Sequence, residues 1–98
     1  MASLRYSDEL GEDVERIVAP LLAHEVERVD ERLGEIFEAM AVLTRHPMIG
    51  RPAGDIHREL IIGKGGRGYV ALYRYDELDD VVVVVALRGQ REAGFEDR

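Results

Sequence analysis

The spacing of hydrophobic residues changes once along this chain. Up to about residue 45, apolar side chains recur every three to four positions, which places them on one face of an α-helix. Further along, they alternate with polar residues or form continuous runs, as in β-strands. The pattern predicts an α+β fold, with two amphipathic helical segments over about residues 7–45 and a small antiparallel β-sheet over about residues 58–88.

Two apolar stripes make up the helical half. The first comprises Leu10, Val14, Ile17, Val18, Leu21 and Leu22, and the second comprises Val26, Val29, Leu33, Ile36, Phe37, Met40, and Leu43 or Thr44. Ser7 is expected to cap the first helix. Pro20 would cost about 3 kcal/mol inside that helix, so it predicts a kink or an end there. Gly34 costs about 1 kcal/mol relative to alanine, which predicts a close approach of two elements. Periodicity alone also permits one continuous bent rod.

The second half reads as three strands, over residues 58–62, 69–75 and 81–87, and a short strand over about residues 2–6 precedes the helices. The short connections between the three predict antiparallel neighbours. One face of the middle strand carries Val70, Leu72 and Arg74, and the other carries Tyr69, Ala71, Tyr73 and Tyr75. We expect one face to pack on the helices and the tyrosine face to point toward a partner or solvent. The valine run in the last strand predicts cover on both faces.

The chain has 98 residues and no cysteine. This length predicts a single domain over residues 1–98, without disulfides and without a thiol nucleophile. No signal peptide is visible, and the longest apolar run has seven residues, whereas crossing a bilayer takes about 20. We therefore expect a soluble, cytoplasmic protein with no membrane contact.

Charge is unevenly distributed in a chain of net charge −7. Residues 1–45 hold eleven acids against five arginines, whereas residues 46–75 hold five basic residues against two acids. An acidic chain is a poor general nucleic-acid binder, because affinity for phosphates comes mostly from Lys and Arg. A basic surface on the strand half remains possible, and the acidic helices could simply keep the protein soluble.

Three short motifs suggest a chemistry that the surrounding sequence does not support. Gly63, Gly65 and Gly68 fit G-x-G-x-x-G, but a strand follows where dinucleotide binding needs a helix N-terminus. His24-Glu25 begins a zinc-protease signature that has Arg28 in place of the second histidine. The two serines, both near the N-terminus, lie in no nucleophile motif. We expect no metal and no cofactor.

Three other strings are more specific: HPMIGRP over residues 46–52, GYVALYRYD over residues 68–76 and QREAGF over residues 90–95. Through them the chain resembles the RelE/ParE superfamily of bacterial toxins, in the branch often labelled plasmid-stabilisation proteins. The resemblance covers nearly the whole length. It implies the toxin fold of that superfamily, in which the helices form a hairpin that turns around Ala23-His24-Glu25 and packs on the sheet. It also implies a type II toxin–antitoxin module.

The resemblance implies two different activities. Members of the ribonuclease branch cleave mRNA with sheet arginines and a C-terminal tyrosine or histidine; Arg74, Arg88 and Arg91 would be the catalytic residues here, but Phe95 stands where a tyrosine is expected. ParE-like members are not nucleases and inhibit DNA gyrase. On that interpretation, which the sequence resembles more, the target-binding residues are Arg74, Arg88, Gln90, Arg91 and Phe95. A third hypothesis is a non-toxic binding module of an autoregulatory repressor complex.

A cognate ParD-like antitoxin is the expected partner, and DNA is expected to be contacted only indirectly, through the antitoxin complex. A hairpin on a sheet leaves grooves and edges that a helix or an added strand can fill. We expect an apolar groove near the hairpin, bordered by acids. The antitoxin-binding residues predicted there are Leu21, Leu22, Val29, Tyr69 and Tyr73.

Overall fold

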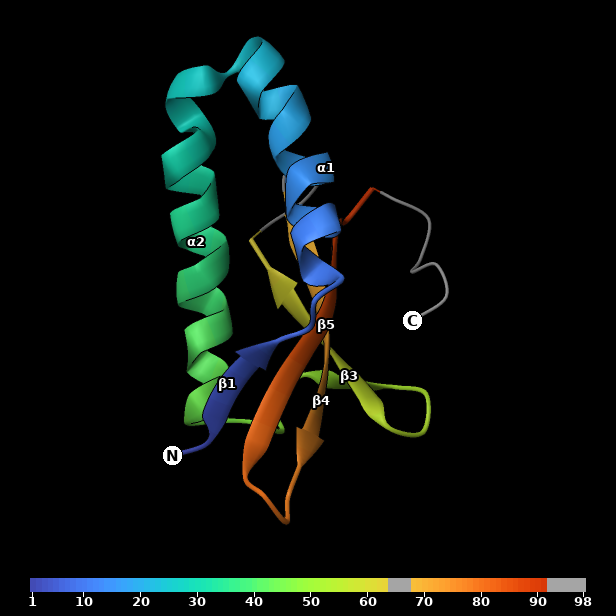
Figure 1. Cartoon of the computed structure of the whole chain (residues 1–98). Helices are drawn as coiled ribbons and strands as arrows, with labels where there is room; N and C mark the ends of the chain where they lie inside the picture. Colours follow the sequence, from blue (N-terminus) through green and yellow to red (C-terminus); the bar gives the residue numbers. More distant parts are fainter. Residues whose placement is uncertain (64–67, 92–98) are drawn as a thin grey trace.

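The computed structural model describes residues 1–63 and 68–91. In chain order its elements are β1 (Ser3–Tyr6), α1 (Leu10–His24), the 3₁₀ turn η1 (Val26–Arg28), α2 (Val29–Ala41), the 3₁₀ turn η2 (Val42–Thr44), β2 (Arg51–Ala53), β3 (His57–Ile62), β4 (Tyr69–Asp76) and β5 (Val81–Gly89). Figure 1 shows α1 and α2 as a hairpin whose connection lies at one end of the molecule, with the β4–β5 turn at the other end. The predicted α+β fold of two helices on a small sheet is confirmed.

The sheet has five strands in the order β1-β5-β4-β3-β2. β3, β4 and β5 are antiparallel neighbours, as predicted, and β2 is antiparallel to β3. β1, however, runs parallel to β5, with Ser3 beside Val81 and Tyr6 beside Val84. The whole helical hairpin connects the first strand to the rest of the sheet, so the crossover is long enough for a parallel pair. The sequence did not suggest β2, because it is only three residues long and contains Pro52.

The helices differ from expectation in three details. α1 begins at Leu10, and the hydroxyl of Ser7 donates to the carbonyl of Val85 at 3.1 Å, so Ser7 does not cap the helix through its side chain. Pro20 lies inside α1, which continues to His24, so the proline does not end the helix. The close approach predicted at Gly34 is wrong, since a Cβ placed there would meet nothing within 4 Å.

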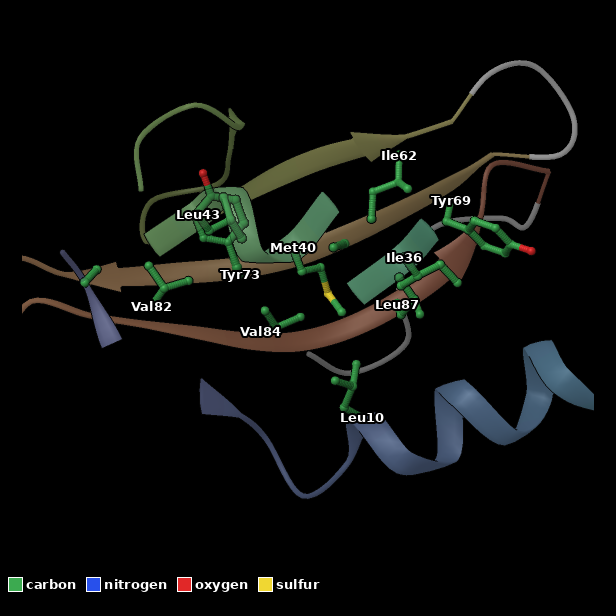
Figure 2. Close-up of a cluster of buried hydrophobic side chains, with 12 residues drawn as sticks. Leu10, Ile36, Met40, Leu43, Ile62, Tyr69, Tyr73, Val82, Val84 and Leu87 are labelled. Carbon is green, nitrogen blue, oxygen red and sulfur yellow. The ribbon is translucent and has the colours of Figure 1, made fainter. Parts of the chain in front are cut away.

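The core lies between the helices and the tyrosine face of the sheet (Figure 2), which corrects the prediction that this face points outward. Tyr73 is fully buried, together with Ile36 and Met40 of α2. Both faces of β4 are apolar, so alternation alone could not decide which one the helices cover. The tyrosines are the larger side chains, and covering them removes more apolar area from water.

Tyr73 also fixes the loop that leads from the helices to the sheet. Its hydroxyl accepts a hydrogen bond from the backbone N–H of Gly50 at 2.8 Å, and burial raises the pKa of Tyr73. A Cβ on Gly50 would lie 2.7 Å from the tyrosine ring and from the carbonyl oxygen of Glu59. Arg58 donates to the carbonyl oxygens of Gly50 at 2.6 Å and Met48 at 3.2 Å. The HPMIGRP string therefore has a structural reason: its glycine lies directly against a buried tyrosine.

Candidate functional site

The sheet face turned away from the helices carries two of the predicted target-binding arginines. Val70 pairs with Arg88 and Leu72 with Ala86, so Arg74 and Arg88 share this face. The guanidinium of Arg88 lies 3.9 Å from a carboxylate oxygen of Glu59, and Glu59 also accepts a hydrogen bond from Arg51 at 3.0 Å. Arg51 and Arg88 therefore both lie near the carboxylate of Glu59 on this face of the sheet.

Arg74 and Arg88 do not lie side by side. Arg88 is across from Val70, and Arg74 is four residues further along β4, which corresponds to about 13 Å along a strand. The register of β3 with β4 ends at the pair of Arg58 with Tyr73, so His57, the first residue of β3, lies near Arg74 of β4. The face therefore has two basic ends, one with Arg88 and one with Arg74.

The remaining target-binding residues lie elsewhere. The backbone N–H of Gln90 donates to the carbonyl of Gly68 at 3.0 Å, which joins the end of β5 to the start of β4. Arg91 lines a cleft beside the helical hairpin. Phe95 lies outside the described residues. The structure does not bring the described members of the set, Arg74, Arg88, Gln90 and Arg91, together in a single patch.

That cleft, of about 530 Å³, lies between the helical hairpin and the adjoining ends of β4 and β5. Its described lining residues are Arg16, Ile17, Pro20, Leu21, Glu25, Arg32, Gly68, Tyr69, Gly89 and Arg91. We refer to it as the arginine cleft. The described lining contains three arginines and one acid, whereas the sequence predicts an apolar groove with acids at its border.

The predicted antitoxin-binding residues divide around the arginine cleft. Leu21 and Tyr69 line it, although each is largely buried. Leu22 is 57% exposed outside it, and Val29 is half-buried on α2. Tyr73 is fully buried in the core, so its assignment to the antitoxin surface is wrong. Helices packed on the tyrosine face leave no access to that ring.

A buried carboxylate connects α1 to the strand that carries Arg88. Asp13 is 4% exposed; it accepts a hydrogen bond from the backbone N–H of Leu87 at 2.9 Å and another from Arg16 at 2.8 Å. Arg16 also donates to the carbonyl oxygen of Leu87 at 2.8 Å. These side chains satisfy backbone groups of β5 beyond Val84, where its pairing with β1 ends. This contact could not be predicted from the sequence, since Asp13 looks like an ordinary first-turn acid.

A second hollow, of about 330 Å³, lies near the β2–β3 turn and is lined in part by His57, Arg58 and Tyr75. The hydroxyl of Tyr75 donates to Asp80 at 2.7 Å, and this hydrogen bond raises the pKa of Tyr75. Within residues 1–63 and 68–91, no group of three or more His, Asp or Glu is placed to hold a metal ion. None of the described helices has the length and apolar character needed to span a bilayer.

The arrangement matches a protein of known structure. The chain superposes on a chain of the toxin–antitoxin complex RelBE2 from Mycobacterium tuberculosis with a TM-score of 0.57 and 20% identity, covering 91% of this chain and 98% of the other. The likeness shows the fold, which is that of the RelE/ParE superfamily of toxins. Residues 4–94 match the family of the ParE toxin of the type II toxin–antitoxin system, parDE. The chain belongs to that family. No curated protein matches it.

Proposed function

We propose that this ParE-family toxin acts by binding a protein target, DNA gyrase, and that a ParD-like antitoxin neutralises it. The observation that carries the proposal is the placement of the chain's four tyrosines. Those of β4 share the helix-covered face, and the ring of Tyr6 contacts Phe37 of α2 with the two centroids 5.8 Å apart. Arg74 and Arg88 therefore lie on the sheet face opposite the tyrosines of β4, so their face carries no β4 phenol to transfer a proton, as RNA cleavage would need.

Charge supports the same proposal. The face holds Arg88 beside Glu59, and it belongs to a chain of net charge −7. A guanidinium group placed among apolar side chains is a typical anchor in protein interfaces. Val70 and Leu72 lie between Arg74 and Arg88 on β4, but they are only 2% and 6% exposed. An arginine that pairs with a carboxylate in an acidic chain suits a protein partner better than a phosphate backbone.

One observation favours a second candidate function. His57, near Arg74, carries an imidazole that could act as a base next to a cation. A ribosome-dependent endoribonuclease would use such a pair, with Arg74 stabilising the developing negative charge. This alternative makes His57 the residue that distinguishes the two functions.

Purified protein assayed for gyrase supercoiling and, in parallel, for mRNA cleavage on ribosomes tests the proposal. We expect inhibited supercoiling and intact RNA, and loss of inhibition in the double variant Arg88→Ala with Arg91→Ala. Arg45→Ala, which removes an exposed arginine after α2, is the matched control and should inhibit fully. RNA cleavage that His57→Gln abolishes would establish the ribonuclease instead. Absence of growth arrest on expression would indicate the non-toxic binding module.

The antitoxin surface is proposed around the exposed apolar residues of the hairpin. Leu22 and Val26 are 57% and 61% exposed, beside the arginine cleft. An amphipathic antitoxin helix that covers them would remove this area from water. Co-expression with the product of the neighbouring small open reading frame should yield a stable complex, and Leu22→Asp should weaken it, whereas Leu78→Asp, at the exposed β4–β5 turn, should not. If the neighbouring product is never recovered, the antitoxin assignment fails.

A further inference from the structure

The arginine cleft reverses the charge of its surroundings. The chain has 20 Asp and Glu against 13 Lys and Arg, and residues 1–45 are the most acidic part. Around this cleft, however, the described lining contains Arg16, Arg32 and Arg91 and one carboxylate, that of Glu25. The buried carboxylate of Asp13, 2.8 Å from Arg16, offsets the charge of that arginine, and the balance of these five groups is still positive. The three guanidinium groups come from α1, α2 and the segment after β5, so the local positive charge arises from the fold rather than from a basic stretch of sequence.

Arg16 and Arg32 are constrained by the fold, whereas Arg91 is exposed. Arg16 is held by its hydrogen bonds to Asp13 and to the carbonyl of Leu87. Arg32 is only 8% exposed, on the face of α2 that is turned toward the sheet. Arg91 follows directly after the contact between Gln90 and Gly68. Guanidinium groups held in place lose little freedom when they bind an anion, which favours recognition.

The rest of the lining leaves room for a group that is partly apolar. Gly89 lies across from Tyr69 in the sheet register, so one of these paired positions carries no side chain. Ile17, Pro20 and Leu21 line the side formed by α1. The cleft therefore combines positive charge with aliphatic walls, and it adjoins the exposed side chain of Leu22.

We propose that the arginine cleft binds a carboxylate side chain carried on an apolar segment of a protein partner. The inference rests on the proposed function, in which that partner is the antitoxin, and it names the chemistry of the antitoxin's anchor: an Asp or Glu beside aliphatic residues. The carboxylate binds to the guanidinium groups, and the aliphatic residues pack on Ile17 and Pro20. A nucleic acid fits less well, because its successive phosphates would meet the acidic hairpin beyond the cleft.

The probes for the test are two capped tripeptides, N-acetyl-Leu-Glu-Leu amide and its glutamine counterpart, titrated into the full chain at low salt. Binding is followed by NMR through the backbone amides of Tyr69 and Gly89 and the side-chain Nε–H groups of the arginines. We expect the glutamate peptide to shift the resonances of cleft residues and to bind about tenfold more tightly than the glutamine peptide. An oligouridylate serves as the phosphate probe and should bind more weakly at the same resonances.

Three variants separate a binding role from a structural one. Arg91→Gln should weaken the glutamate peptide about fivefold to tenfold. Glu25→Gln, which removes the carboxylate among the described lining residues, should strengthen it. Arg45→Gln makes the same charge change as Arg91→Gln outside the described lining of the cleft and should leave the affinity unchanged. If Glu25 and Arg91 had only a structural role, no variant, Glu25→Gln included, should bind the glutamate peptide more tightly than the unaltered chain.

Several results would overturn the inference: no shifts at the cleft, equal affinity for the two tripeptides, or stronger binding of the oligouridylate there. The toxin assignment is tested separately with the antitoxin. An antitoxin that binds Arg91→Gln as tightly as the unaltered chain overturns the cleft inference and leaves the proposed function standing. An antitoxin that binds neither the unaltered chain nor the Arg91→Gln variant overturns the proposed function.

Discussion

Replacing Tyr73 by phenylalanine should destabilise the fold through one hydrogen bond. The substitution keeps the buried ring, so the core packing on Ile36 and Met40 is retained. It removes the hydroxyl that accepts the backbone N–H of Gly50 at 2.8 Å. Tyr73 is fully buried and Gly50 is buried as well, so water has little access to replace the lost acceptor. An unsatisfied buried donor costs about 1–3 kcal/mol.

That loss would be a large part of the total stability, since domains of this size unfold with about 5–15 kcal/mol. Urea unfolding followed by far-UV circular dichroism should show a lower midpoint with an unchanged slope. In thermal unfolding, each kcal/mol should lower Tm by about 4–8 °C. Tyr75→Phe is the matched control, because its hydroxyl bonds to the exposed Asp80 and its loss should cost about 0.5 kcal/mol or less. Equal stability losses in the two variants would refute the reasoning.

Four further expectations follow from the same contacts. Gly34→Ala should raise the unfolding free energy by about 0.5–1 kcal/mol, since its new methyl group meets nothing, and a decrease in urea unfolding would contradict this. Gly50→Ala, the same change against the ring of Tyr73, should instead lower it by about 1–3 kcal/mol, and equal signs for the two glycines would count against the model of a tight loop. Asp13→Ala should cost about 1–3 kcal/mol and speed hydrogen exchange at the amide of Leu87 but not at that of Val84; uniform exchange would argue against the contact. Burial raises the pKa of Tyr73 in the folded state, so its contribution to stability is complete below about pH 10 and is lost as the pH rises further. The unfolding free energy of Tyr73→Phe should therefore decline less steeply above about pH 10 than that of the unaltered chain, and parallel curves would contradict this.

The elements that depend on local pattern were predictable from the sequence. The change of period separated the helices from the strands, and the β4 and β5 positions match closely. The strand pairing of β1 was not predictable, because no local feature of residues 2–6 indicates that they pair in parallel with β5. The same limit hid the tyrosine orientation: two apolar faces of β4 are locally equivalent, and only the position of α2 distinguishes them.

The arginine cleft was hidden for a related reason. Arg16 and Arg32 belong to the acidic half of the sequence, where they counted as minority charges on polar helix faces. Their meeting with Arg91 depends on how the hairpin lies on the end of the sheet. The net charge of a sequence segment does not reveal such a site, because folding brings together charged residues that are distant in the sequence. The segment with a positive net charge is residues 46–75, whereas most of the residues that line the cleft lie outside that segment.

The end of β5 brings the two candidate surfaces within a few residues of each other. Leu87 is held to α1 by Asp13 and Arg16, Arg88 points to the face away from the helices beside Glu59, and Gly89 lines the arginine cleft. Successive residues of a strand point to opposite faces, so this segment serves both surfaces. A partner seated in the cleft would therefore contact the same strand end that presents Arg88. In such an arrangement, an antitoxin in the cleft could affect a target-binding face on the other side of the sheet without a long-range conformational change. Adjacent residues of β5 connect the two surfaces.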